Sequence, residues 1–259
     1  MECRKSSAGI EIRMLRKVLL LLIVAGVGTW VYFHYFKPKP ATWQSLSPDI
    51  EWRKIQIKGA GFLNSDVEVV VVRFDPGHLH VETGKSKTAE EWRASTDSIA
   101  AINGGFFDEN NHSLGLRQSN GKEISSLRHA NWGVFFVQDG KAQIVHTRDF
   151  QKIDQKSITE AIQCGPRLVV DGAPTDLKDQ WARRTGIGIT ENGKVLIAVC
   201  DSELSLRQWA KFWAAKDGLH CQQALNLDGG GSSQLAIKTK NTDLQIDGVW
   251  PVPDAVVIR

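Results

Sequence analysis

The sequence predicts an α+β fold, a mixed, largely antiparallel sheet with a few flanking helices, preceded by one N-terminal transmembrane helix. Short β-branched and apolar segments alternate with turn signals such as Asp-Pro-Gly and Asn-Gly along most of the chain. Only three segments carry helix signals, and no internal repeat or second linker interrupts residues 50–259. We therefore expect one domain over residues 50–259, with its helices packed on a sheet built mainly from hairpins.

The expected strands follow one another at short intervals. Residues 66–74 (DVEVVVVRF) are β-branched and apolar up to an Asp-Pro-Gly turn. Two later hairpins close at Asp139-Gly140 and Asn192-Gly193, dipeptides that favour tight two-residue turns. The complete set of expected strands is 66–74, 78–82, 98–102, 133–138, 141–147, 167–170, 185–190, 194–200, 224–227, 234–239 and 255–258.

Three short helices are expected between these strands. A Thr-x-x-Glu capping box at 88–91 predicts a helix to about Thr96, and Ser-x-x-Glu at 157–160 opens a second. The clearest helix is 205–216, where leucine and aromatic residues recur at helical spacing before Gly218.

The N-terminal region has the pattern of a signal anchor. Residues 18–36 contain no Asp, Glu, Lys or Arg over 19 positions, long enough to cross a bilayer. Basic residues are denser before this segment than after it, so residues 1–17 are expected in the cytoplasm and the folded domain on the opposite side. Residues 37–49 form a proline-rich linker. A cleaved signal peptide is the alternative, although Ala25-Gly26-Val27 fits a cleavage site poorly.

The charge distribution argues against nucleic acid as a partner. The formal net charge of +3 comes from the first 40 residues, which hold seven of the 32 basic and two of the 29 acidic residues. The remaining chain is close to neutral, so it has no domain-wide basic field.

Cysteine and histidine spacing does not indicate a metal site, and no cofactor is expected. Cys164, Cys200 and Cys221 lack a C-x-x-C partner and allow one disulfide with one thiol left over, in any pairing. His78 and His80 would share one side of a strand, which is more often a pair of solvated surface residues than a ligand pair.

The stretch 226–233 (NLDGGGSS) is the strongest candidate for a functional loop. It lacks the spacing of a Walker A loop and the closing glycine of a nucleophile elbow, and a strand rather than a helix follows it. Two interpretations are left: a polar turn, or a loop whose successive amides bind an anion beside the Asp228 carboxylate.

Three other polar motifs also stand at expected strand ends. They are NGGFFD at 103–108, Arg183-Arg184-Thr185 before a strand, and Asp201-Ser202 after one. Each alone is typical of a turn or a solvated face, but guanidinium groups are suited to phosphate contact. Four such loops at strand ends indicate convergence on one edge of a sheet.

Taken in order, NGGFFD, CGPRLVVDG, RRTGIGI, AVCDS and ALNLDGGGSS resemble the phosphodiester glycosidase family, over about residues 98–233. The chain is most similar to the compact, membrane-anchored bacterial branch. The resemblance implies hydrolysis of a sugar–phosphate diester at the glycosidic bond. Together with the expected signal anchor, these motifs give the hypothesis of a bacterial inner-membrane protein with its domain in the periplasm, acting on a phosphorylated cell-envelope glycan or glycolipid.

The resemblance itself places the family's polar positions on Asn103, Asp108, Arg184, Thr185, Asp201, Asp228, Ser232 and Ser233. Phe107 is added for stacking on a sugar ring, and the three glycines are added for their backbone amides. Asp228 or Asp201 would act at the anomeric carbon as nucleophile or as the base that activates water, and Arg184 would stabilise the phosphate. The expected catalytic residues are Asp228, Asp201 and Arg184, and the expected substrate-binding residues are Asn103, Phe107, Asp108, Thr185, Gly229, Gly230, Gly231, Ser232 and Ser233.

Two other functions use the same loops. A non-catalytic envelope protein would bind phosphorylated or acidic glycans without turnover. A phosphodiesterase would cleave the P–O bond rather than the C–O bond.

Overall fold

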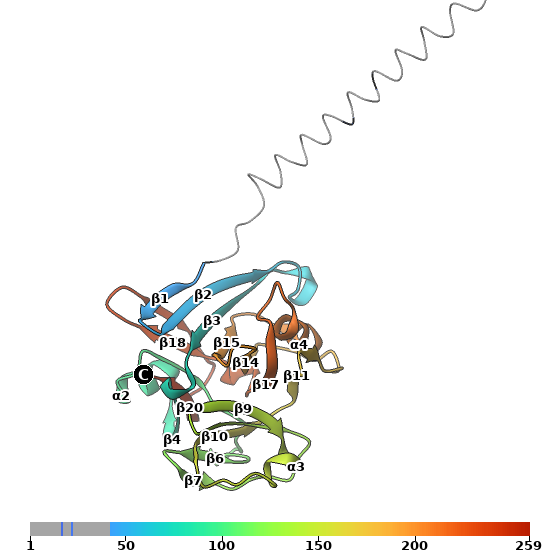
Figure 1. Ribbon diagram of the computed structural model, residues 1–259. Coiled ribbons are helices and arrows are strands. Elements are labelled where there is room, and N and C mark those ends of the chain that lie inside the picture. The colour runs from blue at the N-terminus through green and yellow to red at the C-terminus, as the bar shows by residue number, and fades with distance from the viewer. Residues whose placement is uncertain (1–16, 18–21, 23–41) are drawn as a thin grey trace, which may run out of the picture. The chain divides into compact units, whose positions relative to one another are not determined.

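The computed structural model describes residues 17, 22 and 42–259. The chain divides into two compact units, residues 1–41 and 42–259, and the second carries the fold described below (Figure 1). The predicted cytoplasmic tail and transmembrane segment, 1–17 and 18–36, lie outside the described residues apart from Lys17 and Leu22. Within the described part of the chain, no helix is long and apolar enough to cross a membrane.

Antiparallel sheets dominate residues 42–259, where every pair of adjacent strands is antiparallel. The predicted largely antiparallel sheet is thus confirmed, although it is divided into several sheets. The first has eight strands in the order β1 (Gln44–Ser47), β2 (Ile50–Ile57), β3 (Val67–Phe74), β15 (Val195–Cys200), β14 (Thr185–Thr190), β17 (Cys221–Asn226), β11 (Arg167–Val170) and β12 (Ala173–Pro174).

Two five-stranded sheets and one short ribbon complete the strands. One sheet has the order β7 (Lys122–Ser125), β6 (Arg117–Ser119), β10 (Ile158–Cys164), β8 (Gly133–Gln138) and β9 (Lys141–His146). The other has the order β19 (Asp243–Ile246), β18 (Leu235–Lys238), β5 (Ala100–Asn103), β20 (Val252–Ile258) and β4 (Leu79–Lys87). The ribbon pairs β13 (Trp181–Ala182) with β16 (Leu204–Ser205).

Few helices flank these sheets. They are α2 (Ala89–Ser95), α3 (Thr147–Phe150) and α4 (Leu206–Ala214), with 3-10 turns η2 (Phe62–Asn64), η3 (Pro76–His78) and η4 (Gly230–Ser232). The capping box predicted before α2 forms, because Thr88 and Glu91 each bond the other's backbone N–H. Ser205 caps α4 by accepting a hydrogen bond from the Gln208 N–H. Figure 1 shows α4 beside β11 and β17, whereas α3 lies beside β9 in the lower part of the view.

The helix predicted to open at Ser157 is wrong, because residues 158–164 form β10. The capping pattern is overridden by pairing, since β10 lies between β6 and β8 and is buried on both faces. Glu160, the expected cap partner, is 3% exposed and accepts hydrogen bonds from the Val81 N–H at 2.8 Å and the Asn120 N–H at 3.0 Å.

The central strands β3, β15 and β14 of the eight-stranded sheet are buried on both faces, which explains their long apolar runs. In β3, Val67, Val69 and Val71 face the cluster under α4, whereas Val70, Val72 and Phe74 face the core between the sheets. A strand covered on both faces reads as a continuous apolar run rather than an alternating one.

Trp213 of α4 packs directly on the backbone of β14. A Cβ on Gly188 would lie 2.5 Å from its ring, and one on Gly186 would lie 2.9 Å from it. The alternating glycines of the TGIGIT motif therefore let a fully buried indole approach the strand.

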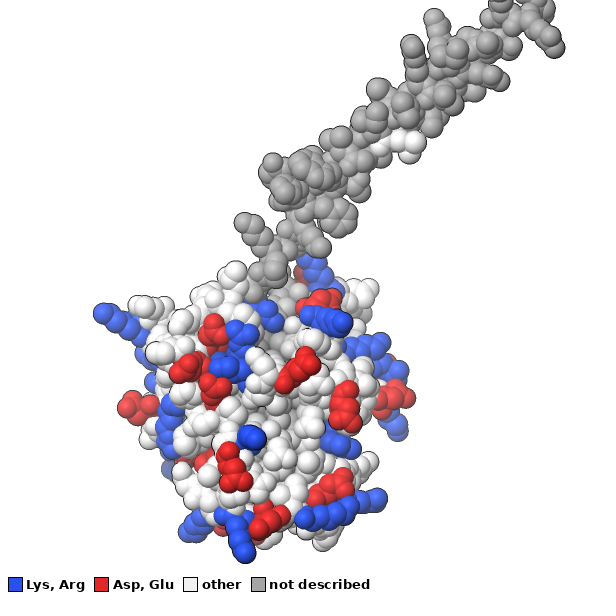
Figure 2. Space-filling view, viewed as in Figure 1, with Lys and Arg blue, Asp and Glu red and all other residues white. Residues whose placement is uncertain are grey.

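The outer surface carries both signs of charge. On the face shown in Figure 2, basic and acidic side chains are interspersed over the folded unit. This mixture agrees with the near-neutral composition of the chain after residue 40.

Candidate active site

The candidate site lies where β5, β14 and β17 meet at one edge of the fold. Because β15 and β17 both run antiparallel to β14, they end at the edge where β14 begins. The Thr185 hydroxyl at the start of β14 donates to Asn103 Oδ1 at 2.8 Å, and Asn103 Nδ2 donates to the Asp228 carbonyl at 2.8 Å. The NGG, RRT and LDGGGSS motifs therefore lie together.

Asn103 fixes the backbone of the site and has no hydrogen-bonding capacity left for a sugar. It is 1% exposed. Its Oδ1 also accepts from the Gln234 N–H at 3.2 Å, and its Nδ2 also reaches the Gly104 carbonyl at 3.3 Å. The sequence analysis expected Asn103 to bind substrate, whereas the structure shows it joining three strand ends.

Asp228 is the titratable group at the centre of this junction. Burial raises the pKa of its carboxyl to about 6, and the charge of Asp254 adds to the rise. The Ser232 hydroxyl, the Gly229 N–H at 3.0 Å and the charge of Arg117 favour the ionised form and limit the rise. A carboxyl with this pKa changes protonation near neutral pH, as acid–base catalysis requires.

Behind Asp228 lies a buried ion pair that sequence reasoning missed. Arg117 is 0% exposed and Asp254 1%, and Arg117 Nε donates to Asp254 Oδ2 at 3.0 Å. The Gly105 N–H and the Ser113 hydroxyl also donate to Asp254, at 2.9 and 2.7 Å. Its one sequence signal is an acid inside the apolar strand VPDAVVI.

The guanidinium of Arg117 also donates to three backbone carbonyls. It donates to Leu116 and Gln163 at 3.0 Å and to Phe106 at 3.1 Å. A Cβ on Gly104 would overlap Asp254 and one on Gly105 would overlap Arg117, so the two glycines of NGGFFD let the chain pass against the ion pair.

Arg184 is buried beside the glycine loop with part of its guanidinium engaged. Its Nε donates to the Leu204 carbonyl at 3.1 Å, and Nη2 donates to the Gln180 carbonyl. Among residues 42–259, Nη1 has no hydrogen-bond acceptor, and it lies 4.0 Å from where a Cβ on Gly229 would stand. Burial lowers the pKa of Arg184, which still leaves it charged at neutral pH.

The glycine loop does not present a row of open amides. The Gly230 N–H donates to the Arg183 carbonyl at 2.9 Å, and the Ser232 and Ser233 N–H groups close turns within the loop at 3.2 Å. Within the described chain, the Gly231 N–H is the loop amide left without an acceptor. The expected nest of successive amides is therefore reduced to one N–H by the turn η4.

The two serine hydroxyls of the loop differ in their partners. Ser232 Oγ accepts from the indole Nε1 of Trp250 at 3.1 Å, and the Trp250 ring packs against Gly231. Ser233 Oγ is fully buried and has no hydrogen-bond partner among the described residues. Trp250, 48% exposed, is a surface aromatic beside the site that the sequence analysis did not select.

Three other expected site residues are engaged elsewhere. The Asp201 carboxylate is exposed and accepts from the Glu68 N–H of β3 at 3.3 Å, on the side of β15 away from β14. The Asp108 carboxylate accepts from the N–H groups of His112 and Asn110, which lower its pKa. Phe107 packs against the cluster around Trp92.

Two cysteines lie close to the site, where Cys200 Sγ accepts from the Arg184 N–H at 2.9 Å and the charges of Arg117 and Asp228 act on Cys164. Within the described residues, no group of three or more His, Cys, Asp or Glu side chains is placed to hold a metal ion. The three cysteines after residue 42 are buried and unpaired, so the disulfide allowed by their number does not form. Burial raises the pKa of Cys164 and of Cys200 to about 12, which keeps both thiols protonated.

Residues 96–259 match the family description "Phosphodiester glycosidase". The chain belongs to this family. It is 31% identical over 144 residues to the uncharacterized protein YigE of Escherichia coli K12, an alignment that covers 50% of this chain and about half, 54%, of that relative.

Two solved structures share the fold of this phosphodiester glycosidase family member. One is the zebrafish N-acetylglucosamine-1-phosphodiester alpha-N-acetylglucosaminidase catalytic domain, auto-inhibited by its pro-peptide. It has a TM-score of 0.67 and 17% identity, over 85% of this chain and 87% of that one. The other is a hypothetical protein from Synechocystis, with a TM-score of 0.59 and 16% identity, over 86% and 64% of the two chains.

Replacing Asp254 with Asn is expected to lower the free energy of unfolding by about 3–5 kcal/mol, because Arg117 would stay buried without its counter-charge. Urea denaturation measures the change. Lys152→Ala is the control, since it breaks an exposed pair with Asp149, 2.9 Å long, and should change stability by at most about 1 kcal/mol. Equal effects of the two substitutions would contradict a structural role for the buried pair.

Proposed function

We propose that this protein hydrolyses the glycosidic bond of a sugar-1-phosphodiester on a cell-envelope glycan or glycolipid. The observation that carries the proposal is the Asp228 carboxyl. This carboxyl has a pKa of about 6, and Asn103 fixes its loop by donating to the Asp228 carbonyl. Arg184 Nη1, which has no acceptor among residues 42–259, lies near the next residue of the loop, Gly229. Family membership supports the reaction class.

In the proposed reaction, a water oxygen bonds to the anomeric carbon as the bond from that carbon to the phosphate oxygen breaks. The phosphate monoester leaves with the bonding electron pair, and ionised Asp228 accepts the proton of the water. The leaving phosphate is a weak base and needs charge stabilisation more than protonation. Asp254, whose charge acts on Asp228, is held by Arg117 and takes no part on the sugar side.

The groups around Asp228 suit the two halves of such a substrate. Arg184 Nη1 and the Gly231 N–H are donors for the phosphate oxygens. Both are preorganised, because Arg184 Nε already donates to Leu204 and the Gly231 carbonyl already accepts from Val249. The exposed ring of Trp250 provides an apolar face for the sugar, a role that the sequence analysis gave to Phe107. We assign no step to Asp201, because its carboxylate is bonded towards β3.

Asp228→Asn is expected to lower kcat/KM by about 10²–10⁴-fold, the usual contribution of a general base. The assay is release of reducing sugar from a panel of α- and β-sugar-1-phosphodiesters by residues 41–259. Asp171→Asn, the same change on an exposed turn, serves as the control and should leave the rate unchanged.

Three outcomes would count against this proposal. An unchanged rate in Asp228→Asn would remove the residue from the chemistry. Saturable binding without turnover across the panel would favour a non-catalytic glycan-binding protein. Oxygen-18 from water appearing in phosphate instead of sugar would identify a phosphodiesterase that cleaves the P–O bond.

The pH dependence of kcat/KM tests the same carboxyl. Burial raises the pKa of Asp228 from 3.8 to about 6, so the basic form accumulates only as the pH passes about 6. A phosphodiester has no proton to lose in this range, and kcat/KM should therefore rise through an apparent pKa near 6 and then level off. A fall above pH 6 would instead mean that protonated Asp228 is the active form.

We also propose that residues 18–36 anchor the protein in the bacterial inner membrane with residues 42–259 in the periplasm. The support is the uncharged apolar sequence and its basic N-terminal flank. Protease added to spheroplasts should then digest the folded unit, whereas full protection of the unit until lysis would contradict the orientation.

A further inference from the structure

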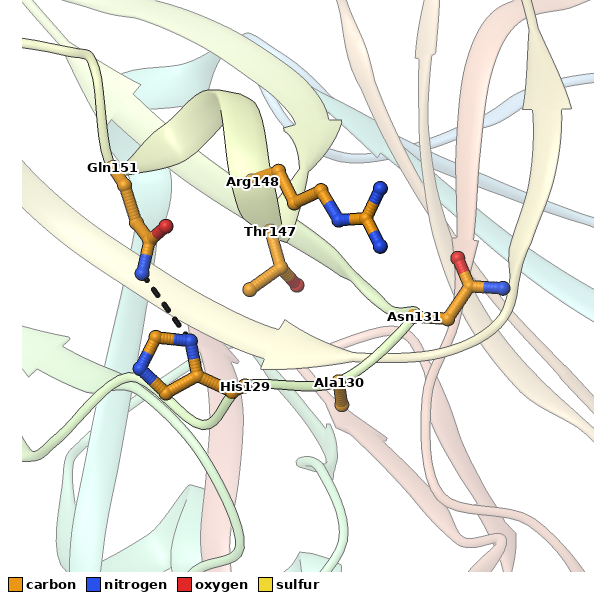
Figure 3. Close-up of a pocket in the computed structure, with 6 residues that line it drawn as sticks. All are labelled: His129, Ala130, Asn131, Thr147, Arg148 and Gln151. Atoms are coloured by element: carbon orange, nitrogen blue, oxygen red, sulfur yellow. Dashed lines mark hydrogen bonds between the residues drawn. The ribbon is translucent and has the colours of Figure 1, made fainter.

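A polar pocket lies outside the candidate active site, between the loop before β8 and the short helix α3. Its volume is about 360 Å³, and Figure 3 shows the six residues that line it. They are His129, Ala130, Asn131, Thr147, Arg148 and Gln151. None of the six is acidic, so the pocket has donors and positive charge without a carboxylate.

One arginine in the wall of this pocket and two near it form no salt bridge with the described residues. Among residues 42–259, Arg128, Arg148 and Arg167 form no salt bridge, although the protein pairs many of its other basic side chains. Arg148 lines the pocket, and the guanidinium of Arg128 lies 5.9 Å from the ring centre of Trp132, next to the lining residue Asn131. The adjacent acid, Asp149, is bonded to Lys152.

The hydrogen bonds at the pocket wall fix the tautomer of His146 and the orientation of Asn131. His146 Nδ1 accepts from the Arg148 N–H at 3.1 Å, so the proton of the neutral ring is on Nε2 and is donated to Asn131 Oδ1 at 2.9 Å. With its oxygen occupied, Asn131 has its amide NH₂ group free to donate. Figure 3 shows the Arg148 guanidinium extending from α3 towards Asn131.

The electrostatics of His146 agree with a positive surrounding. Its pKa is lowered by burial and further by the charges of Arg167 and Arg148, with Asp149 opposing. The imidazole therefore stays neutral at neutral pH, and the charge of the region comes from the arginines.

The pocket is connected to the candidate active site through Trp132. This ring packs against Gly165, whose carbonyl accepts from Asn226 Nδ2 at 3.2 Å. The Asn226 N–H donates to the next carbonyl, Pro166, at 3.0 Å. Asn226 precedes Asp228 by two residues, so packing and hydrogen bonds link Trp132, the neighbour of the lining residue Asn131, to the catalytic loop.

We propose that this pocket binds a phosphoryl group carried by the glycan substrate, as a second anionic subsite beside the catalytic loop. Arginine presents its donors in a fork that matches phosphate oxygens, and no acidic side chain lines the pocket to oppose an anion. The volume exceeds that of a phosphate ion and falls in the range of small-molecule sites, about 300–1,000 Å³, so an attached sugar also fits. The substrate part of the inference rests on the proposed function.

Calorimetric titration of residues 41–259 with glucose 6-phosphate, inorganic phosphate and glucose tests the site without any turnover. Glucose 6-phosphate should bind more tightly than phosphate, and glucose should not bind. Arg148→Glu should weaken glucose 6-phosphate binding at least tenfold. Lys122→Glu makes the same charge change on β7, at the opposite edge of the five-stranded sheet from β9, and should leave binding unchanged.

Asp228→Asn separates this proposal from the proposed function, since it should retain glucose 6-phosphate binding whether or not the protein is a glycosidase. If Arg148→Glu were misfolded by circular dichroism, the exposed Asn131→Asp would replace it, with the same loss expected. Binding unaffected by both substitutions would overturn the pocket. Equal affinity for phosphate and glucose 6-phosphate, or binding only to vesicles of phosphatidylglycerol, would overturn the glycan as the source of the phosphoryl group.

Discussion

The buried ion pair between Arg117 and Asp254 is the interaction on which the candidate site depends. It joins β6 of one five-stranded sheet to β20 of the other, and its remaining donors and acceptors hold the chain on either side of Gly105. Two charges removed from water are costly, and the cost is offset only when every donor and acceptor finds a partner. Here the backbone carbonyls of Leu116, Gln163 and Phe106 accept from most of the remaining guanidinium donors, so the pair and the loop path require each other.

The same pair sets the electrostatic surroundings of Asp228. Asp254 disfavours the ionised form of Asp228 and Arg117 favours it, so the two effects partly cancel and burial dominates the pKa. Arg117 without Asp254 would lower the pKa of Asp228, and Asp254 without Arg117 would raise it. An ion pair supplies rigidity to the loop with little net charge, which leaves Asp228 able to change protonation near pH 6.

Local patterns predicted most strands and two of the three helices, because capping residues, Asn-Gly turns and apolar runs act over a few residues. The failures involve long-range pairing. Ser157–Glu160 has the letters of a capping box, but Glu160 bonds to the backbone at Val81 and Asn120, which no local pattern reveals. The motif loops were located from their strand-end positions, whereas Asp254 was missed because its partner is 137 residues away. Asp201 follows a strand as Asp228 does, and only the sheet order shows that its carboxylate turns to the other neighbour.

The four hydrogen-bonding contacts of Asn103 have a consequence for when the site comes into existence during synthesis. Its partners Thr185, Asp228 and Gln234 are 82, 125 and 131 residues further along the chain. Contacts of this separation form late, because the intervening segments must be ordered first. A chain still being made, or one cut before Gln234, therefore has the motifs but not their junction. Asp228 acquires its raised pKa only when nearly the whole chain has folded.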